Sequence, residues 1–134
     1  MKYTKELLIN HVNECFVNSD RNESKLSADI LSMEGMSGTK TRHLYNNICS
    51  LSGANYLEIG VFRGSTFCSA IYGNNIKATG IDNWSSPYLM PNGVSQKMTS
   101  YLRSQPSDPK EEFLTNVKKF GNVENNFSMI LKNK

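Results

Sequence analysis

The chain has 134 residues, of which 38% are apolar and 20% are charged, and its net charge at pH 7 is +3. This length and composition are ordinary for one globular domain with a real core. The lysines and arginines are scattered along the chain rather than gathered in a dense stripe, so the charge indicates neither a nucleic-acid nor a membrane partner.

The cysteines and histidines indicate neither disulfides nor a metal site. Cys15, Cys49 and Cys68 are far apart and form no Cys-x-x-Cys pair, so we expect buried, reduced thiols in a cytoplasmic protein. The two histidines have no cluster of cysteines or aspartates nearby, so no metal is expected. The sequence has no signal-peptide apolar stretch and no run of about 20 apolar residues, which predicts neither export nor membrane insertion.

Residues 1–52 are predicted to form a helical segment. Apolar residues recur at three- and four-residue intervals between Tyr3 and Val17, which is the period of an amphipathic helix. A second, short helix is expected from Ala28 to Gly35 and a third from about Thr41 to Ser50. The glycines of Gly35-Met36-Ser37-Gly38 predict a tight loop between these two helices.

Residues 53–134 are predicted to contain a parallel sheet. An apolar run from Tyr56 to Val61 is bounded by turn signals on both sides, as expected for a central strand buried on both faces. Ser65 to Tyr72 is predicted to be the crossover helix. Ile76 to Ile81 is predicted to be the second strand, and Asp82 follows it directly.

The remaining residues are predicted to form a loop, a helix and a third strand. Prolines and polar residues between Asn83 and Pro109 indicate a long surface excursion, with a helical turn around Gln96 to Leu102. Asp108 caps a helix from Pro109 to Phe120, and Phe127, Met129 and Leu131 mark the strand. We therefore predict one α/β domain, a partial doubly wound (Rossmann-like) parallel sheet of about three strands with an N-terminal helical segment.

The glycine turn after the first strand predicts a nucleotide-type cofactor. Gly60 and Gly64 lie between that strand and the helix, and the acidic Asp82 follows the next strand about 20 residues on. The spacing is not the G-x-G-x-x-G of dinucleotide sites, because Phe62 stands where the middle glycine should be. Glu58, inside the strand, would repel phosphates and suits a ligand with a positive charge.

These residues resemble a family, the class I S-adenosylmethionine-dependent methyltransferases. Glu58-Ile59-Gly60-Val61-Phe62-Arg63-Gly64-Ser65 is similar to the family's first motif, and Gly80-Ile81-Asp82-Asn83-Trp84 is similar to its second. The resemblance covers Ala54 to Trp84. It implies that S-adenosylmethionine is the cofactor and that a methyl group passes to an acceptor, which the sequence does not identify.

The resemblance also implies roles for individual residues. Glu58 would bind the amino group of the methionine part, Gly60 to Thr66 would wrap that part, and Asp82 would hold the ribose hydroxyls. Asn83 and Trp84 would border the adenosine, with Trp84 offering a stacking face. The Gly35–Gly38 loop is expected to close over the methionine end. The implied cofactor-binding residues are Glu58, Gly60, Phe62, Arg63, Gly64, Ser65, Thr66, Asp82, Asn83 and Trp84. No catalytic residue is indicated.

Three alternatives stay open at this stage. The family has a seven-stranded sheet in which the first strand is central, whereas this sequence stops at the third strand. Leu57 and Ile59 would then lie at an exposed edge, covered by a second copy or by a missing second half. A non-catalytic cofactor- or partner-binding module, half of a split or truncated enzyme, is therefore an alternative function. A nicotinamide-type oxidoreductase fragment is disfavoured by Phe62 and Glu58.

The third alternative concerns Glu58 itself. It could be a structural carboxylate paired with Arg42 or Arg63 rather than a ligand contact. Arg63 is otherwise expected to be solvated or a general anion contact rather than catalytic.

Overall fold

The computed structural model describes residues 3–84, 100, 104, 108–121 and 127–131. In chain order its elements are α1 (Lys5–Asp20), α2 (Ala28–Leu31), α3 (Thr39–Ile48), β1 (Asn55–Ile59), α4 (Ser65–Ile71), β2 (Lys77–Asp82), α6 (Pro109–Phe120) and β3 (Phe127–Leu131). The strands and the helices α1, α3, α4 and α6 lie close to where the sequence predicted them. The predicted helical turn around Gln96 to Leu102 falls almost entirely outside the described residues.

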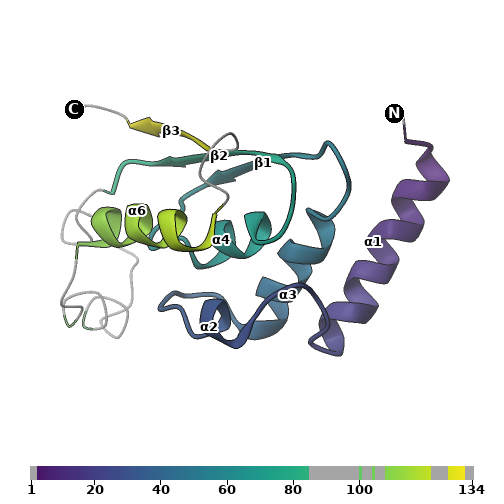
Figure 1. Ribbon diagram of the computed structural model, residues 1–134, viewed down its shortest axis with the longest axis horizontal. Helices are drawn as coiled ribbons and strands as arrows, with labels where there is room; N and C mark the ends of the chain where they lie inside the picture. The colour runs from purple at the N-terminus through teal and green to yellow at the C-terminus, as the bar shows by residue number, and fades with distance from the viewer. Residues whose placement is uncertain (1–2, 85–99, 101–103, 105–107, 122–126, 132–134) are drawn as a thin grey trace.

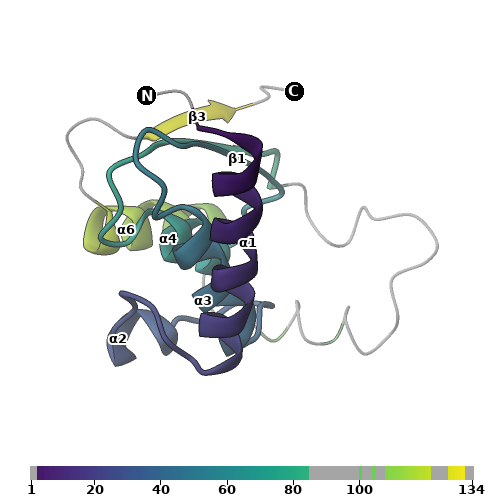
Figure 2. The ribbon, with the colours of Figure 1, turned by 90° about the vertical axis from the view of Figure 1, so that its right-hand side faces the viewer.

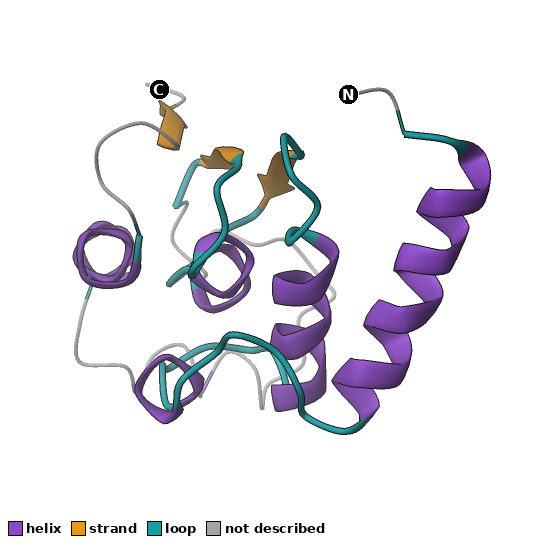
Figure 3. Cartoon of the chain, turned by 45° about the vertical axis from the view of Figure 1, so that its right-hand side comes forward, coloured by secondary structure: helices purple, strands orange, loops and turns teal. Residues whose placement is uncertain are grey.

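The three strands form one parallel sheet in the order β1-β2-β3. Helices α4 and α6 run side by side beneath the same face of this sheet (Figures 1 and 3). This arrangement confirms the predicted α/β class with a parallel sheet of three strands. The connections β1-α4-β2 and β2-α6-β3 are those of the repeated βαβ unit, which places the carboxyl ends of β1 and β2 at one edge of the domain.

The core lies between the sheet and these two helices. Phe67 of α4 and Phe113 of α6 are completely buried, and their ring centroids are 5.5 Å apart. Tyr56 of β1 continues the aromatic stack, with its ring 5.9 Å from that of Phe67. Six of the seven residues of α4 are buried, so this short helix owes its stability to packing rather than to its own length.

The prediction that β1 is buried on both faces is wrong. Tyr56 and Glu58 are partly buried, whereas Leu57 and Ile59 are 57% and 77% exposed. Successive side chains of a strand point to opposite faces, so the exposed pair lies on the face away from α4. Among the described strands β1 stands at the edge of the sheet.

Helix α1 forms as predicted, but its apolar face is only partly buried. Figure 2 shows α1 standing alongside α3, and these two helices pack together. Cys15 and Ser19 are buried in that contact. The other apolar side chains of α1 stay 38% to 53% exposed: Leu7, Leu8, Ile9, Val12, Phe16 and Val17. The prediction that Cys15, Cys49 and Cys68 are buried is confirmed, and the structure places no disulfide between them.

Helix α2 ends at Leu31, earlier than the predicted end at Gly35. The reason is a side chain from α3. The guanidinium of Arg42 donates hydrogen bonds to the carbonyl oxygens of Leu31 and Met33, at 3.0 and 2.9 Å, which holds these residues out of a continuing helix. None of the helices in the described part of the chain is long and apolar enough to cross a membrane.

Asn46 of α3 joins the N-terminal helices to the sheet layer. It is completely buried, and its amide nitrogen donates to the carbonyl oxygens of Ser69 and Tyr72, both at 2.8 Å. Its amide oxygen accepts the backbone N–H of Lys25 at 3.0 Å. One side chain thus supplies partners for three backbone groups from two separate segments.

We predict that Asn46→Ala lowers the free energy of unfolding by about 2–4 kcal/mol, because it leaves buried backbone groups without their partners. Urea unfolding followed by circular dichroism measures this change. Asn47→Ala is the matched control on the same helix, since Asn47 donates to the carbonyl oxygen of Glu23 in an exposed setting. Equal losses for the two variants would contradict the role given to Asn46.

Candidate functional site

The carboxyl ends of β1 and β2 bring two acidic side chains to one edge of the sheet. Glu58 of β1 is in register with Gly80 of β2, and Asp82 ends β2. In open parallel sheets ligands bind outside the carboxyl ends of the strands. The predicted pair of Glu58 and Asp82 therefore lies where a ligand of this fold class would contact both.

Glu58 is held by two hydroxyl groups. The Tyr56 hydroxyl donates to one carboxylate oxygen, and the Thr66 hydroxyl donates to the other at 2.5 Å. Burial raises the pKa of Glu58 above its ordinary value; the two hydroxyl donors lower that pKa, and the charge of Asp82 raises it. A partly buried carboxylate with further lone pairs is well suited to a cationic group.

The two arginines considered as partners of Glu58 donate elsewhere. Arg42 binds the segment between α2 and α3, and Arg63 binds Glu112 of α6. The described hydrogen bonds of Glu58 are thus with hydroxyl groups. Neither of these partners carries a positive charge that would balance the charge of the carboxylate.

Asp82 fixes the two turns that border the site. One of its oxygens accepts the backbone N–H of Phe62 at 2.8 Å, and the other accepts that of Trp84 at 2.7 Å. Phe62 and Trp84 have φ values of +49° and +42°, a conformation that costs a non-glycine residue about 1–2 kcal/mol. Each carboxylate oxygen has a second lone pair, which a ribose hydroxyl is able to use.

The two glycines of the turn are needed for different reasons. Gly60 has a φ of +85°, and no described atom lies within 4 Å of the position a Cβ would take. Gly64 has a φ of +87°, but a Cβ there would be 2.7 Å from the ring of Phe113. Gly60 therefore borders open space, whereas Gly64 allows α6 to pack against the turn.

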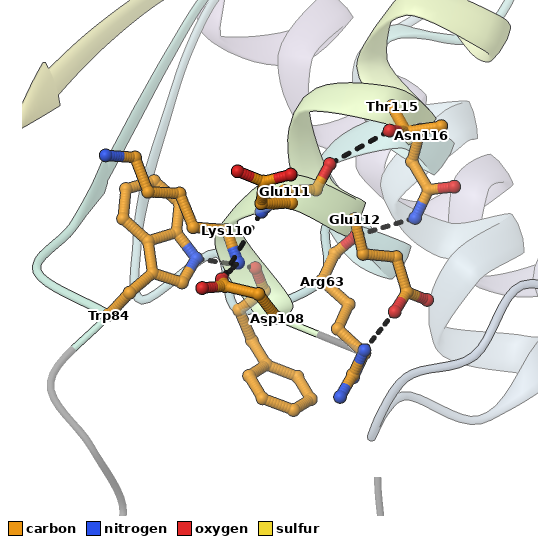
Figure 4. A network of polar contacts seen from close by, with 9 residues as sticks. Arg63, Trp84, Asp108, Lys110, Glu111, Glu112, Thr115 and Asn116 are labelled. Carbon is orange, nitrogen blue, oxygen red and sulfur yellow. Dashed lines mark hydrogen bonds and ion pairs between the residues drawn. The ribbon is translucent and has the colours of Figure 1, made fainter. Parts of the chain in front are cut away.

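Of the two expectations for Arg63, the solvated side chain is wrong, and the side chain instead contacts an anionic group. Arg63 is 1% exposed, and its guanidinium forms an ion pair with Glu112 of α6 (Figure 4). The side-chain amide of Asn116 donates to the Arg63 carbonyl oxygen at 3.0 Å. Arg63 thus anchors the glycine turn to α6.

Trp84 packs toward the core instead of extending freely into solvent. Its indole N–H donates to the carbonyl oxygen of Phe62 at 2.9 Å, and its ring lies 5.6 Å from that of Phe113. The ammonium of Lys110 lies 6.0 Å from the indole centroid (Figure 4). Asn83, between Asp82 and Trp84, is exposed.

The Gly35–Gly38 loop lies against the start of α4. The hydroxyl oxygens of Ser37 and Ser65 are 2.9 Å apart. A Cβ on Gly35 would be 2.3 Å from the Ser65 hydroxyl oxygen, so only glycine allows this approach. The Gly35–Gly38 loop, predicted to close over the methionine end, therefore contacts Ser65. The next residue in the chain, Thr66, donates the hydrogen bond to Glu58.

Sequence reasoning did not assign Tyr56 and Arg42 to this region. Tyr56 lies two residues before Glu58 on the same face of β1, and that spacing is a signal that was available in the sequence. Arg42 was considered only as an ion-pair partner. Its role depends on a loop path that no local pattern indicates.

Comparisons with known proteins leave the family open. No protein-family model matches the sequence, and no curated protein matches it. One solved structure with a similar fold is the crystal structure of coclaurine N-methyltransferase bound to N-methylheliamine and SAH, at 13% sequence identity and a TM-score of 0.42. The match covers 99% of this chain and 41% of the methyltransferase chain. A similarity this distant supports no conclusion about family or ligand.

We predict that Glu58→Gln becomes progressively more stable than the wild type as the pH rises above 4.5, the ordinary pKa of the carboxyl. The folded state raises the pKa of Glu58, so it stabilises the protonated form; that stability is present at low pH and is lost as Glu58 ionises. Urea unfolding of both proteins between pH 4.5 and pH 8 measures the difference.

The exposed Glu14→Gln on α1 is the control for this series. A wild type that gains stability over Glu58→Gln with rising pH would show that the carboxylate is stabilised by its surroundings, contrary to the burial described above.

Proposed function

We propose that this chain binds S-adenosylmethionine in the manner of a class I methyltransferase and transfers its methyl group to an acceptor. The observation that carries the proposal is the pair of carboxylates at the ends of β1 and β2, with the open turn at Gly60 beside them. Glu58 suits the ammonium group of an amino acid, and Asp82 suits the diol of a ribose.

The charges of the site favour this ligand over a dinucleotide. Two carboxylates at one edge would repel a pyrophosphate, whereas S-adenosylmethionine carries an ammonium and a sulfonium group. Phe62 also places a side chain where a dinucleotide site needs a glycine.

The residues of this chain act by binding and orientation. When bound, S-adenosylmethionine supplies an electrophilic methyl group on sulfur. Glu58, held by Tyr56 and Thr66, fixes the amino-acid end, and Asp82 fixes the ribose. Two fixed ends determine the direction of the methyl group between them, and in-line transfer depends largely on such positioning. The acceptor stays unassigned.

We expect isothermal titration calorimetry with S-adenosylhomocysteine at pH 8 to show binding to the folded wild type. Glu58→Gln should weaken it about tenfold or more, because the ammonium group loses a charged partner. Binding should also weaken as the pH falls and Glu58 takes up a proton, since burial raises its pKa.

Glu14→Gln again serves as the control, with unchanged affinity expected. If the folded wild-type protein gives no heat of binding with S-adenosylhomocysteine, the cofactor proposal is contradicted. If a nicotinamide dinucleotide displaces S-adenosylhomocysteine and binds more tightly, the oxidoreductase alternative replaces the cofactor proposal.

The edge of β1 supports a second, non-catalytic candidate function, a partner-binding module. Leu57 and Ile59 are exposed on an edge strand, and exposed edges pair readily with another chain. A second copy or another polypeptide adding to β1 would cover this edge next to Glu58, so the two candidates are compatible.

If copies of the chain pair through β1, light scattering should give a concentration-dependent mass above 15.1 kDa, and Ile59→Lys should return it to the monomer value. Phe16→Lys on α1 is the matched control, because Phe16 is also an exposed apolar residue. A monomeric wild type, or dissociation by Phe16→Lys instead, would exclude self-association through β1.

A further inference from the structure

The sheet has helices on one face, while its other face carries exposed apolar side chains. Helices α4 and α6 lie on the first face, and no helix in the described part of the chain lies on the second (Figures 1 and 3). Leu57 and Ile59 of β1 point to this second face, and Ile81 of β2 is in register with Ile59 there. Lys77, at the start of β2, is exposed on the same face. We call this face, with Leu57, Ile59, Ile81 and Lys77, the open face.

Helix α1 has a second apolar side besides the one that packs on α3. The packed side includes His11, whose Nε2 lies 3.1 Å from the carbonyl oxygen of Ile48, and the buried Cys15. The second side has exposed apolar residues at the three- and four-residue spacing of a helix: Leu8, Ile9, Val12 and Phe16. We call these four residues the α1 stripe. Because α1 is held against α3 of its own chain, the stripe is available to another molecule.

The apolar residues of the two surfaces are spaced at matching distances. At about 1.5 Å per residue, Val12 and Phe16 are about 6 Å apart along α1. At about 3.3 Å per residue, Leu57 and Ile59 are about 7 Å apart along β1. A helix that places Val12 near Ile59 and Phe16 near Leu57 therefore covers both exposed side chains of the strand.

The charged residues determine the direction in which such a helix would lie. Asp20, in the last turn of α1, is about 12 Å from Val12, and Lys77 lies about 13 Å along β2 from the apolar end of the open face. With α1 antiparallel to the strands, the exposed carboxylate of Asp20 therefore comes next to the ammonium of Lys77. The reverse direction would bring Lys5 next to Lys77. Asp20 pairs with Lys40 in its own chain, but both side chains are mostly exposed, so this pair is weak.

We propose that the α1 stripe of one copy of this chain packs on the open face of a second copy, antiparallel to the strands. Burial of exposed apolar side chains drives the contact, and the opposite charges of Asp20 and Lys77 orient it. The contact is made by side chains on a face of the sheet, so it differs from pairing along the edge of β1. It does not depend on which ligand the carboxylates of the candidate site bind.

Light scattering of the wild type and of two variants tests this contact. The wild type should show a concentration-dependent mass above 15.1 kDa, and Phe16→Lys and Ile59→Lys should each return it to the monomer value. An equimolar mixture of the two variants should associate again, because one keeps the open face and the other keeps the α1 stripe. Val17→Lys is the matched control, since Val17 is exposed but lies about 140° around α1 from Val12. Circular dichroism checks that each variant is folded.

Several outcomes would overturn the inference. A monomeric wild type, or a mixture of the two variants that stays monomeric, excludes the contact. Loss of association with Ile59→Lys alone indicates pairing along the edge of β1. Loss with Phe16→Lys alone indicates pairing of α1 with α1, and loss with Val17→Lys indicates a different side of α1.

Reversal of the two charges tests the direction of the helix. Lys77→Glu and Asp20→Lys should each weaken association about two- to fivefold, because each variant brings like charges together. The chain that carries both substitutions should associate as the wild type does, since opposite charges meet again. Losses that add in this double variant would overturn the antiparallel arrangement.

Discussion

The bridge that Asp82 makes between two turns is the constraint on which the candidate site depends. Its two oxygens hold the N–H groups of Phe62 and Trp84, which follow β1 and β2 respectively. Both residues have positive φ, a strained conformation that their hydrogen bonds to this carboxylate help to hold. The bridge fixes the path of the chain past Gly60, where open space borders the turn.

The second support of the site comes from the N-terminal helices. Asn46 ties α3 to the end of α4, and Arg42, one turn earlier on α3, shapes the loop that touches Ser65. The start and the end of α4 are therefore both positioned from α3. This explains why a helix of seven residues is held firmly enough to present Thr66 to Glu58.

Much of the sheet was predictable because its signals are local. The glycine turn, the apolar runs and the Asp108-Pro109 helix start each depend on neighbouring residues, and the structure places them close to the predicted bounds. Arg63 shows the limit of such reasoning. Its burial depends on Glu112 of α6, which is distant in sequence, so no local pattern reveals it. The exposure of β1 and α1 likewise depends on which elements pack against them.

The proposed function requires that the carboxyl ends of β1 and β2 hold the two ends of one nucleoside-containing ligand. Two-dimensional ¹H–¹⁵N NMR during titration with S-adenosylhomocysteine tests it most directly. The largest shifts are expected on the backbone amides of Gly60 to Thr66 and on those of Asn83 and Trp84, with the amides of α1 unaffected. Shifts confined to α1, or no shifts at saturating ligand, would contradict it.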